Sequence, residues 1–150
     1  MIKFLTFAFL ISLVTSGLGP TKNCQVNDPA IQKKAKSLKK GTQRDTAREI
    51  FKFVQWKITY VSYSNTKQGA VGTLKKGSGN CCDQAHLIVA LWRAAGINAR
   101  YAHGSHHWWG QAKIDGKGCD CDPTNKKHEF CKPHHGSENK NPQYFESLDH

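Results

Sequence analysis

A capped and almost wholly apolar helix is the sequence feature that most constrains the fold of this chain. Asn80 is a typical N-cap residue, Asp83 follows it by three positions, and Gly96 is a typical C-terminal stop. A helix that is apolar around most of its circumference belongs in a core. The pattern therefore predicts a buried central helix. Its apolar positions are Ala85, Ile88, Leu91, Trp92 and Ala95.

Two adjacent cysteines stand at the start of this helix. With Asn80 as the N-cap, Cys81 occupies the first helical position, where unpaired backbone amides and the helix dipole favour a thiolate. A thiolate of low pKa is the usual form of a cysteine nucleophile. Cys82 follows about 100° around the helix, so only one of the two can face a given cleft. The other is expected to be a packing thiol or a disulfide partner.

A downstream hairpin offers a base and an orienting carboxylate for such a nucleophile. The Asp115-Gly116 pair is a strong signal for a two-residue hairpin turn. Counting outwards from this turn, Asp122 lies opposite Trp109 on the two strands. Because side chains alternate faces, His107 shares a face with Trp109 and is the diagonal neighbour of Asp122.

This parity selects His107 rather than His106 as the partner of Asp122. A three-residue turn or a bulge would reverse the parity and exchange the two histidines. A nucleophilic cysteine needs a base, and the base needs an orienting group. The hairpin supplies both, although spacing alone does not bring them to Cys81.

The remaining pattern predicts helices first and antiparallel strands afterwards, which is the order of an α+β fold. Helices are expected over 29–40 and from 42 onwards, a strand over 57–63, a glycine-containing loop over 64–78, and strands over 98–102 and 107–114. Beyond Thr124 the chain is polar and gives little structural signal. One compact domain with a modest core fits the length of 150 residues.

The first nineteen residues have the order of a secretory signal peptide. Lys3 precedes an apolar run, and small residues follow it, with cleavage expected near Gly17 to Gly19. The run is about a dozen residues long, whereas a membrane span needs roughly 20. A secreted protein without a stable membrane anchor is therefore expected, and a retained anchor is the alternative.

Export changes the interpretation of the six cysteines, because exported thiols tend to pair. If one cysteine is catalytic, two disulfides and one buried thiol would account for the others. A zinc site is the alternative, since soft ligands cluster near the end of the chain. Export and the overlap with Asp122 favour disulfides. No cofactor is required, and neither structural zinc nor a stimulatory divalent cation is indicated. The clustered ligands are Cys119, Cys121, His128, Cys131 and His134.

The formal net charge of +11 predicts attraction to an anionic polymer. Lysines dominate the charge, in the stretch 30–40 and again at Lys126 and Lys127. A cell wall and a nucleic acid are both anionic, but no zinc finger or RNP-type motif indicates specific binding to nucleic acid. A solvated basic face remains an equal alternative. The sequence says nothing about oligomeric state.

Several separated motifs resemble the transglutaminase-like superfamily of cysteine peptidases. GNCCDQAHLIVALWRAAGINARYAHG, followed by HWWGQAKIDG and DPTN, is similar to a pattern in which G-x-C-x-D/E opens the nucleophile helix and H-x-W and D-x-T supply base and orienting group. ITYVSYSNTKQGAVGTL resembles the pseudomurein endoisopeptidases of methanogens and their phages. The match runs from about Thr42 to Asn125. The resemblance implies a papain-like core in which helices pack on an antiparallel sheet.

Carried over by position, the resemblance makes Cys81 the nucleophile, His107 the base and Asp122 the orienting residue. H-x-W also fits from His106, and the interval to D-x-T favours His107. These roles imply acyl transfer through a thioester. The Cys81 backbone amide would be one oxyanion donor, with a second expected near Asn65.

The implied organisation is a signal peptide at 1–19, a basic segment with a short helix at 20–41, a catalytic core at 42–125 and a Cys/His-containing tail at 126–150. The leading function is a secreted hydrolase of amide or isopeptide bonds, acting on a peptide or cell-wall polymer. A protein-glutamine acyltransferase and a non-catalytic binding protein stabilised by disulfides or zinc are the alternatives. Gly118, where the family often has an aromatic residue, and the cysteines flanking Asp120 depart from the family pattern.

Overall fold

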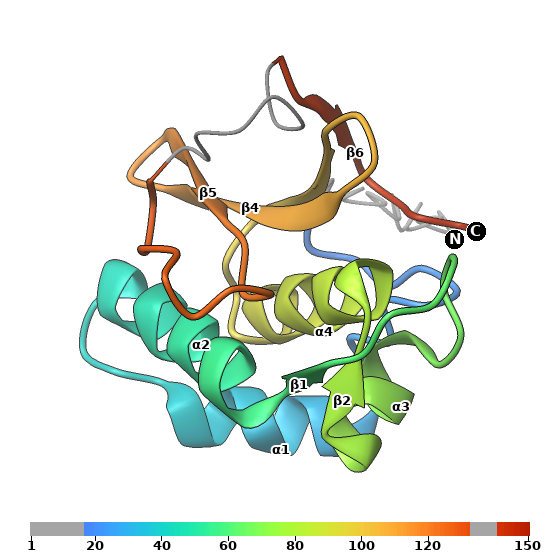
Figure 1. The fold of residues 1–150 in the computed structure, drawn as a ribbon. Helices are drawn as coiled ribbons and strands as arrows, with labels where there is room; N and C mark the ends of the chain where they lie inside the picture. The colour runs from blue at the N-terminus through green and yellow to red at the C-terminus, as the bar shows by residue number, and fades with distance from the viewer. Residues whose placement is uncertain (1–16, 133–140) are drawn as a thin grey trace, which may run out of the picture.

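The computed structural model describes residues 17–132 and 141–150. Most of the predicted signal peptide and His134 therefore lie outside the described residues. The described chain forms four helices and six strands (Figure 1). The helices are α1 (Pro29–Leu38), α2 (Gln43–Lys57), α3 (Gly69–Lys76) and α4 (Cys81–Ala94), and the strands are β1 (Thr59–Tyr60), β2 (Ser78–Gly79), β3 (Ala99–His103), β4 (Trp108–Ile114), β5 (Lys117–Cys121) and β6 (Gln143–Phe145).

The molecule has a helical layer and a sheet layer, with α4 between the sheet and α1 (Figure 1). The sheet is antiparallel and has the strand order β5-β4-β3-β6. Helices α1, α2 and α3 all contact α4, which also packs on β3 and β4. The predicted α+β architecture, with helices packed on an antiparallel sheet, is confirmed.

Helix α4 is the core element that its sequence predicts. Every residue from Cys82 to Arg93 is buried. The helix approaches the sheet closely at Gly110, where a Cβ atom would lie 2.6 Å from Trp92 Cζ3 and 2.9 Å from Ile88 Cγ2. Because any side chain at this position would displace helix residues, Gly110 permits the close packing of α4 on β4.

The β4-β5 hairpin has the predicted two-residue turn. Asp115 and Gly116 have φ values of 51° and 77°, as a turn with two left-handed residues requires. Ile114 pairs with Lys117, and the register continues without a bulge to Gly110 opposite Cys121. This register leaves His107 and Asp122 just beyond the paired strands, at the end of the sheet near α4.

The connection between α2 and α4 differs from the prediction. Helix α2 continues to Lys57, and the expected strand is reduced to β1, whose two residues are both exposed and pair in parallel only with β2. No buried face anchors a longer strand there. The predicted loop contains α3, which packs on α4 through buried Ala70 and Thr73.

Arg93 joins the two ends of the described chain to the sheet. Its guanidinium donates to the carbonyl oxygens of Gly19 at 2.8 Å, Ala99 at 2.9 Å and Glu146 at 2.9 Å. The amide of Ala99 donates in turn to the Gly17 carbonyl at 2.8 Å. Residues that the sequence places at the end of the leader thus contact the domain.

Across residues 17–132 and 141–150, the helices are all too short or too polar to span a lipid bilayer.

Candidate active site

Cys81 stands at the predicted position, on the first turn of α4. The Asn80 side chain caps the helix by accepting from the Asp83 amide at 3.0 Å. Its amide group donates to the carbonyl oxygens of Tyr63 and Asn65, at 3.0 and 2.8 Å. One side chain therefore fixes the helix start and the loop that passes in front of it. Cys81 is partly exposed, whereas its neighbour Cys82 is buried.

Asp83 holds the same loop from beneath. Its carboxylate is fully buried and accepts from the backbone amides of Lys67, Gln68 and Gly69 at 3.2, 3.2 and 2.9 Å. The Tyr63 hydroxyl also donates to it. This bond and burial raise the pKa of Tyr63 to about 12, with burial the larger cause. Asp83, two residues after Cys81, thus holds this loop against the start of α4.

His107 and Asp122 form the pair that the hairpin parity predicts. Nε2 of His107 lies 2.6 Å from Oδ2 of Asp122, whose side chain is 1% exposed. The other carboxylate oxygen accepts from the amide and hydroxyl of Thr124, at 2.9 and 2.7 Å. His106 is exposed. Because Asp122 occupies Nε2 of His107, Nδ1 is the ring nitrogen left for a partner on the other side.

That partner is Cys81. Cys82, His107 and the Trp108 backbone amide all lie close enough to the Cys81 sulfur to act on its pKa. The effect of Cys82 is the largest, and together with the effects of His107 and the Trp108 amide it outweighs burial and holds the pKa of Cys81 well below that of an ordinary thiol. The structure therefore brings Cys81, His107 and Asp122 together.

The pKa values of His107 and Asp122 shift in the directions expected for a positively charged imidazole beside a negatively charged carboxylate. Burial alone would lower the pKa of His107, but its interactions with Asp122 and Cys81 prevail and raise that pKa to about 10. Burial would raise the pKa of Asp122, and the bonds from His107, His128 and Thr124 instead hold it well below its usual range. A thiolate and an imidazolium are therefore the favoured forms of Cys81 and His107 at neutral pH.

Cys82 takes the opposite role to Cys81. Its interaction with Cys81 and, next, its burial raise the pKa of the Cys82 thiol. A thiol that remains protonated and donates can stabilise the adjacent thiolate but cannot serve as a nucleophile. The sequence left Cys82 as either a packing thiol or a disulfide partner. In the structure it is a buried thiol that forms no disulfide.

Large exposed apolar side chains lie on the segment that leads from the end of α2 to the site. Trp56, Tyr60 and Val61 are 58%, 47% and 43% exposed. Tyr60 pairs with Gly79, two residues before Cys81, and its pKa is raised by burial and then by the negative charge of Cys81. At Asn65, near which a second oxyanion donor is expected, the backbone carbonyl accepts from the Asn80 side-chain amide.

The segment after Asp122 contributes a residue that sequence reasoning did not place in the site. Nδ1 of His128 lies 3.3 Å from the Asp122 carboxylate and 3.1 Å from its backbone carbonyl. Gln55 on α2 donates to the carbonyl oxygens of Asn125 and His128, at 2.8 and 2.9 Å. The sequence offered His128 only as a candidate zinc ligand, because no local pattern links it to Asp122.

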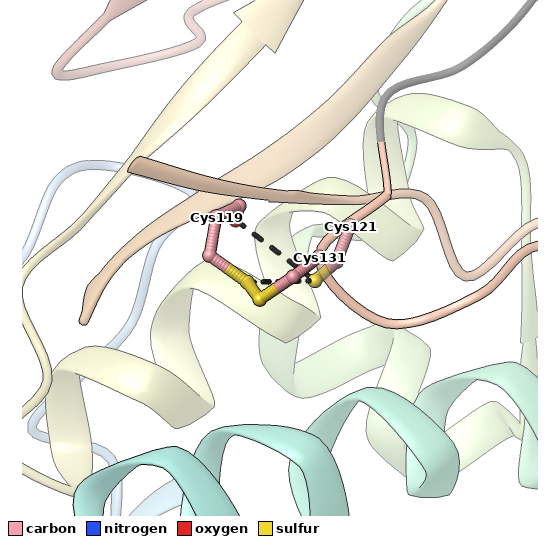
Figure 2. A group of neighbouring side chains, drawn as sticks. All are labelled: Cys119, Cys121 and Cys131. Carbon is pink, nitrogen blue, oxygen red and sulfur yellow. Dashed lines mark hydrogen bonds between the residues drawn. A yellow bond between two sulfur atoms is a disulfide. The ribbon is translucent and has the colours of Figure 1, made fainter. Parts of the chain in front are cut away.

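The cysteine pairing is simpler than predicted. Cys119 and Cys131 form a disulfide, and Cys121 lies beside it with its sulfur 3.6 Å from that of Cys119 (Figure 2). Among the described residues, which include all six cysteines, this is the one disulfide, and Cys24, Cys82 and Cys121 are buried thiols. The expectation of two disulfides is therefore wrong, because no second pair of these sulfurs is bonded.

Of the five residues considered as an alternative zinc site, Cys119, Cys121 and Cys131 have their sulfurs within 4.8 Å of one another. The disulfide uses two of the three clustered sulfurs, so the oxidised protein does not offer them as thiolates. His128 turns to Asp122 instead. His134 lies outside the described residues. The pairing of Cys119 with Cys131 fits the preference for disulfides over metal that export suggested.

Two solved structures have folds similar to that of this chain. A solved structure of a candidate cysteine protease from Cytophaga hutchinsonii is similar, with a TM-score of 0.64 and 29% identity over 71% of this chain and 40% of that one. A candidate protease from Parabacteroides distasonis shares the fold, with a TM-score of 0.56 and 15% identity over 65% of this chain and 25% of that one.

This chain thus spans less than half the length of either solved protein. No curated protein matches its sequence significantly. The sequence profile of the transglutaminase-like superfamily matches residues 31–123, which is more than half of the chain and includes Cys81, His107 and Asp122. The chain belongs to the transglutaminase-like superfamily.

Proposed function

We propose that this protein is a cysteine hydrolase of amide or isopeptide bonds, with Cys81 as nucleophile, His107 as acid and base, and Asp122 as the orienting residue. The observation that carries the proposal is the pairing of Cys81, at the start of α4, with a His107 that is bonded on its other side to buried Asp122. Membership of the superfamily and the likeness to a candidate cysteine protease support the same class of chemistry.

The geometry suits a two-step acyl transfer. The Cys81 thiolate attacks the amide carbonyl carbon, and the carbonyl electron pair moves to oxygen, where the backbone amide of the first helical residue can donate. As the tetrahedral intermediate collapses, the C–N bond breaks and His107 delivers its proton to the leaving amine. A thioester on Cys81 remains.

Water completes the cycle. Neutral His107 removes a proton from a water molecule, which attacks the thioester carbonyl. The C–S bond breaks, the acid product leaves, and the thiolate and the imidazolium are restored. Asp122 keeps Nδ1 of His107 directed towards the sulfur throughout, because it occupies Nε2. A primary amine attacking the same thioester would give transamidation, so access to the thioester decides the outcome.

We infer that the substrate is a peptide of an exported polymer such as a cell wall. The resemblance of residues 58–74 to pseudomurein endoisopeptidases favours an isopeptide, and the Cys119–Cys131 disulfide suits the oxidising surroundings of a secreted protein. Exposed lysines on α1 and at residues 126–127 give the surface a charge suited to an anionic polymer. Trp56, Tyr60 and Val61 offer contact area beside the nucleophile.

The proposal is tested by incubating the purified protein with wall sacculi and, separately, with a glutaminyl peptide and a labelled primary amine. Cys81→Ala serves as the matched control, because it removes only the sulfur. Release of new amino groups by the wild type alone is expected. Incorporation of label instead would indicate a transferase. Absence of both signals over a panel of sacculi and isopeptides would contradict the enzymatic proposal.

A further inference from the structure

His128 is the second imidazole on the buried Asp122 carboxylate. Its Nδ1 is 3.1 Å from the Asp122 carbonyl oxygen and 3.3 Å from Oδ2, the same oxygen that bonds His107. Both neighbours of Nδ1 are acceptors, so this nitrogen carries a hydrogen whether the ring is neutral or charged. The contact with Asp122 therefore persists on both sides of the titration of His128.

Three contacts hold His128 and the residues that follow it, two of them from α2 and one from β5. Gln55, 5% exposed on α2, donates to the carbonyl of His128 itself. Phe130 packs on Phe51, with ring centroids 6.0 Å apart. Cys131 is tied to β5 by the disulfide. These contacts fix the backbone at His128 and after it. Gln55 also donates to the carbonyl of Asn125, so the backbone before His128 is fixed as well.

The anchored residues His128, Phe130 and Cys131 lie in a part of the chain that the superfamily profile does not include, since the profile ends at residue 123. The disulfide begins on β5 at Cys119, three residues before Asp122, and closes on Cys131, three residues after His128. It therefore encloses Asp122 and His128 in one covalent loop. Figure 2 shows this crosslink between the end of β5 and the segment that follows.

We propose that His128 is a positioning residue of the catalytic site: its Nδ1–H holds the Asp122 carboxylate in the orientation that His107 requires, and the Cys119–Cys131 disulfide holds His128 there. The inference rests on the proposed function of Cys81, His107 and Asp122. It adds that the oxidised crosslink supports activity, so that its loss weakens the site even though Cys81 itself needs to be reduced.

The first experiment compares His128→Ala, which removes the donor, with His128→Asn, whose amide nitrogen can occupy the place of Nδ1. His106→Ala is the control, because His106 is exposed and lies outside the pair with Asp122. We expect kcat of His128→Ala to fall about tenfold, as for the loss of one hydrogen bond to a charged group, with KM within about twofold. His128→Asn should retain wild-type kcat within about threefold.

A second readout does not depend on turnover. Iodoacetamide alkylation of Cys81 at pH 6, followed by mass spectrometry, reports the thiolate that the bond between His107 and Asp122 sustains. We expect this rate to fall severalfold in His128→Ala and to recover in His128→Asn. If the wild type turned over no substrate, the proposed function would fail while this readout still tested the role of His128.

The crosslink is tested by a double-mutant cycle with Cys119→Ala/Cys131→Ala, alone and combined with His128→Ala. Because the disulfide is inferred to act through His128, His128→Ala, the double cysteine variant and their combination should show about the same fold decrease in kcat and in alkylation rate. Thermal unfolding identifies any variant that fails to fold. If His128→Ala or a cysteine variant fails to fold, the comparison of His128→Asn with the wild type tests the role of His128.

Wild-type kcat and alkylation in His128→Ala would overturn the proposal, as would a His128→Asn variant as impaired as His128→Ala. Losses that multiply in the combined variant would overturn the link between the disulfide and His128.

Discussion

Asp83 and Asp122 are two buried carboxylates at the same site, and they are bonded in different ways. Asp83 accepts from three backbone amides and from the Tyr63 hydroxyl. Asp122 accepts from Thr124 on one oxygen and lies against two imidazoles on the other. Backbone amides do not titrate, whereas an imidazole exchanges protons near neutral pH.

This comparison distinguishes a carboxylate that stabilises the local structure, Asp83, from one that is proposed to act in catalysis, Asp122. Asp83 fixes residues 63–69 against the start of α4 and so shapes the surroundings of Cys81. Asp122 shares its charge with His107 and so sets the proton affinity of the base. The two roles predict opposite experimental signatures: a change at Asp83 should appear in stability, and a change at Asp122 in activity.

The largest expected effect is on the activity of Asp122→Asn. The amide cannot stabilise the imidazolium form of His107 and favours the wrong tautomer, so kcat/KM should fall by about 10³- to 10⁴-fold. Peptide turnover and urea unfolding are measured side by side. Asp120→Asn is the matched control, because Asp120 accepts from Trp109, Gln111 and Tyr144 and, within residues 17–132 and 141–150, from no histidine. Equal losses of activity in both variants would contradict the distinction.

The main effect of Asp83→Asn should be a decrease of about 3 kcal/mol in the free energy of unfolding. In the wild type a carboxylate oxygen accepts from the backbone amides, whereas the NH₂ group of Asn would face them as a second donor. Urea denaturation gives the value. Asp28→Asn is the control, since Asp28 caps α1 with one side-chain bond and Asn caps equally well. A loss below about 1 kcal/mol for Asp83→Asn would show that the loop does not depend on this carboxylate.

The pH dependence of kcat/KM should be a broad plateau. Because the pKa of Cys81 is lowered, the thiolate persists below neutral pH; because that of His107 is raised to about 10, the imidazolium persists until the pH approaches that value. Removing the Asp122 charge should move the alkaline limit down by about one pH unit or more, since one unit is a modest charge interaction. An alkaline limit that is the same in Asp122→Asn would count against the coupling.

The smallest expected effect is that of Tyr63→Phe. The substitution removes the hydroxyl that donates to Asp83 and that accepts, at 3.1 Å, from the backbone amide of Asn80. The unfolding free energy should fall by about 1 kcal/mol, and kcat should stay within about threefold of the wild type. A large loss of kcat with unchanged stability would instead place Tyr63 in the chemistry.

Local rules predicted the parts of the site that depend on neighbours in sequence. The N-cap Asn80 located the start of α4, and the Asp115-Gly116 turn fixed a register that carries directly to His107 and Asp122. Both inferences need only hydrogen-bonding rules over a few residues and the alternation of side chains along a strand.

The parts that were not predicted depend on contacts between distant segments. Gln55 reaches His128 across more than seventy positions, and nothing near either residue indicates the bond. The segment 57–63 has strand-forming residues, but its exposed side chains find only a two-residue partner, so helix α2 extends and β1 stays short. Tertiary packing overrides local propensity in this case.

We propose that Cys81 is a thiolate at neutral pH because His107 and Cys82 stabilise it. The difference in absorbance at 240 nm between the wild type and Cys81→Ala, followed from acidic to alkaline pH, measures that thiolate directly. We expect the signal to be present already at pH 6, below the ordinary thiol pKa of about 8.5. A signal that appears only above pH 8 would contradict it.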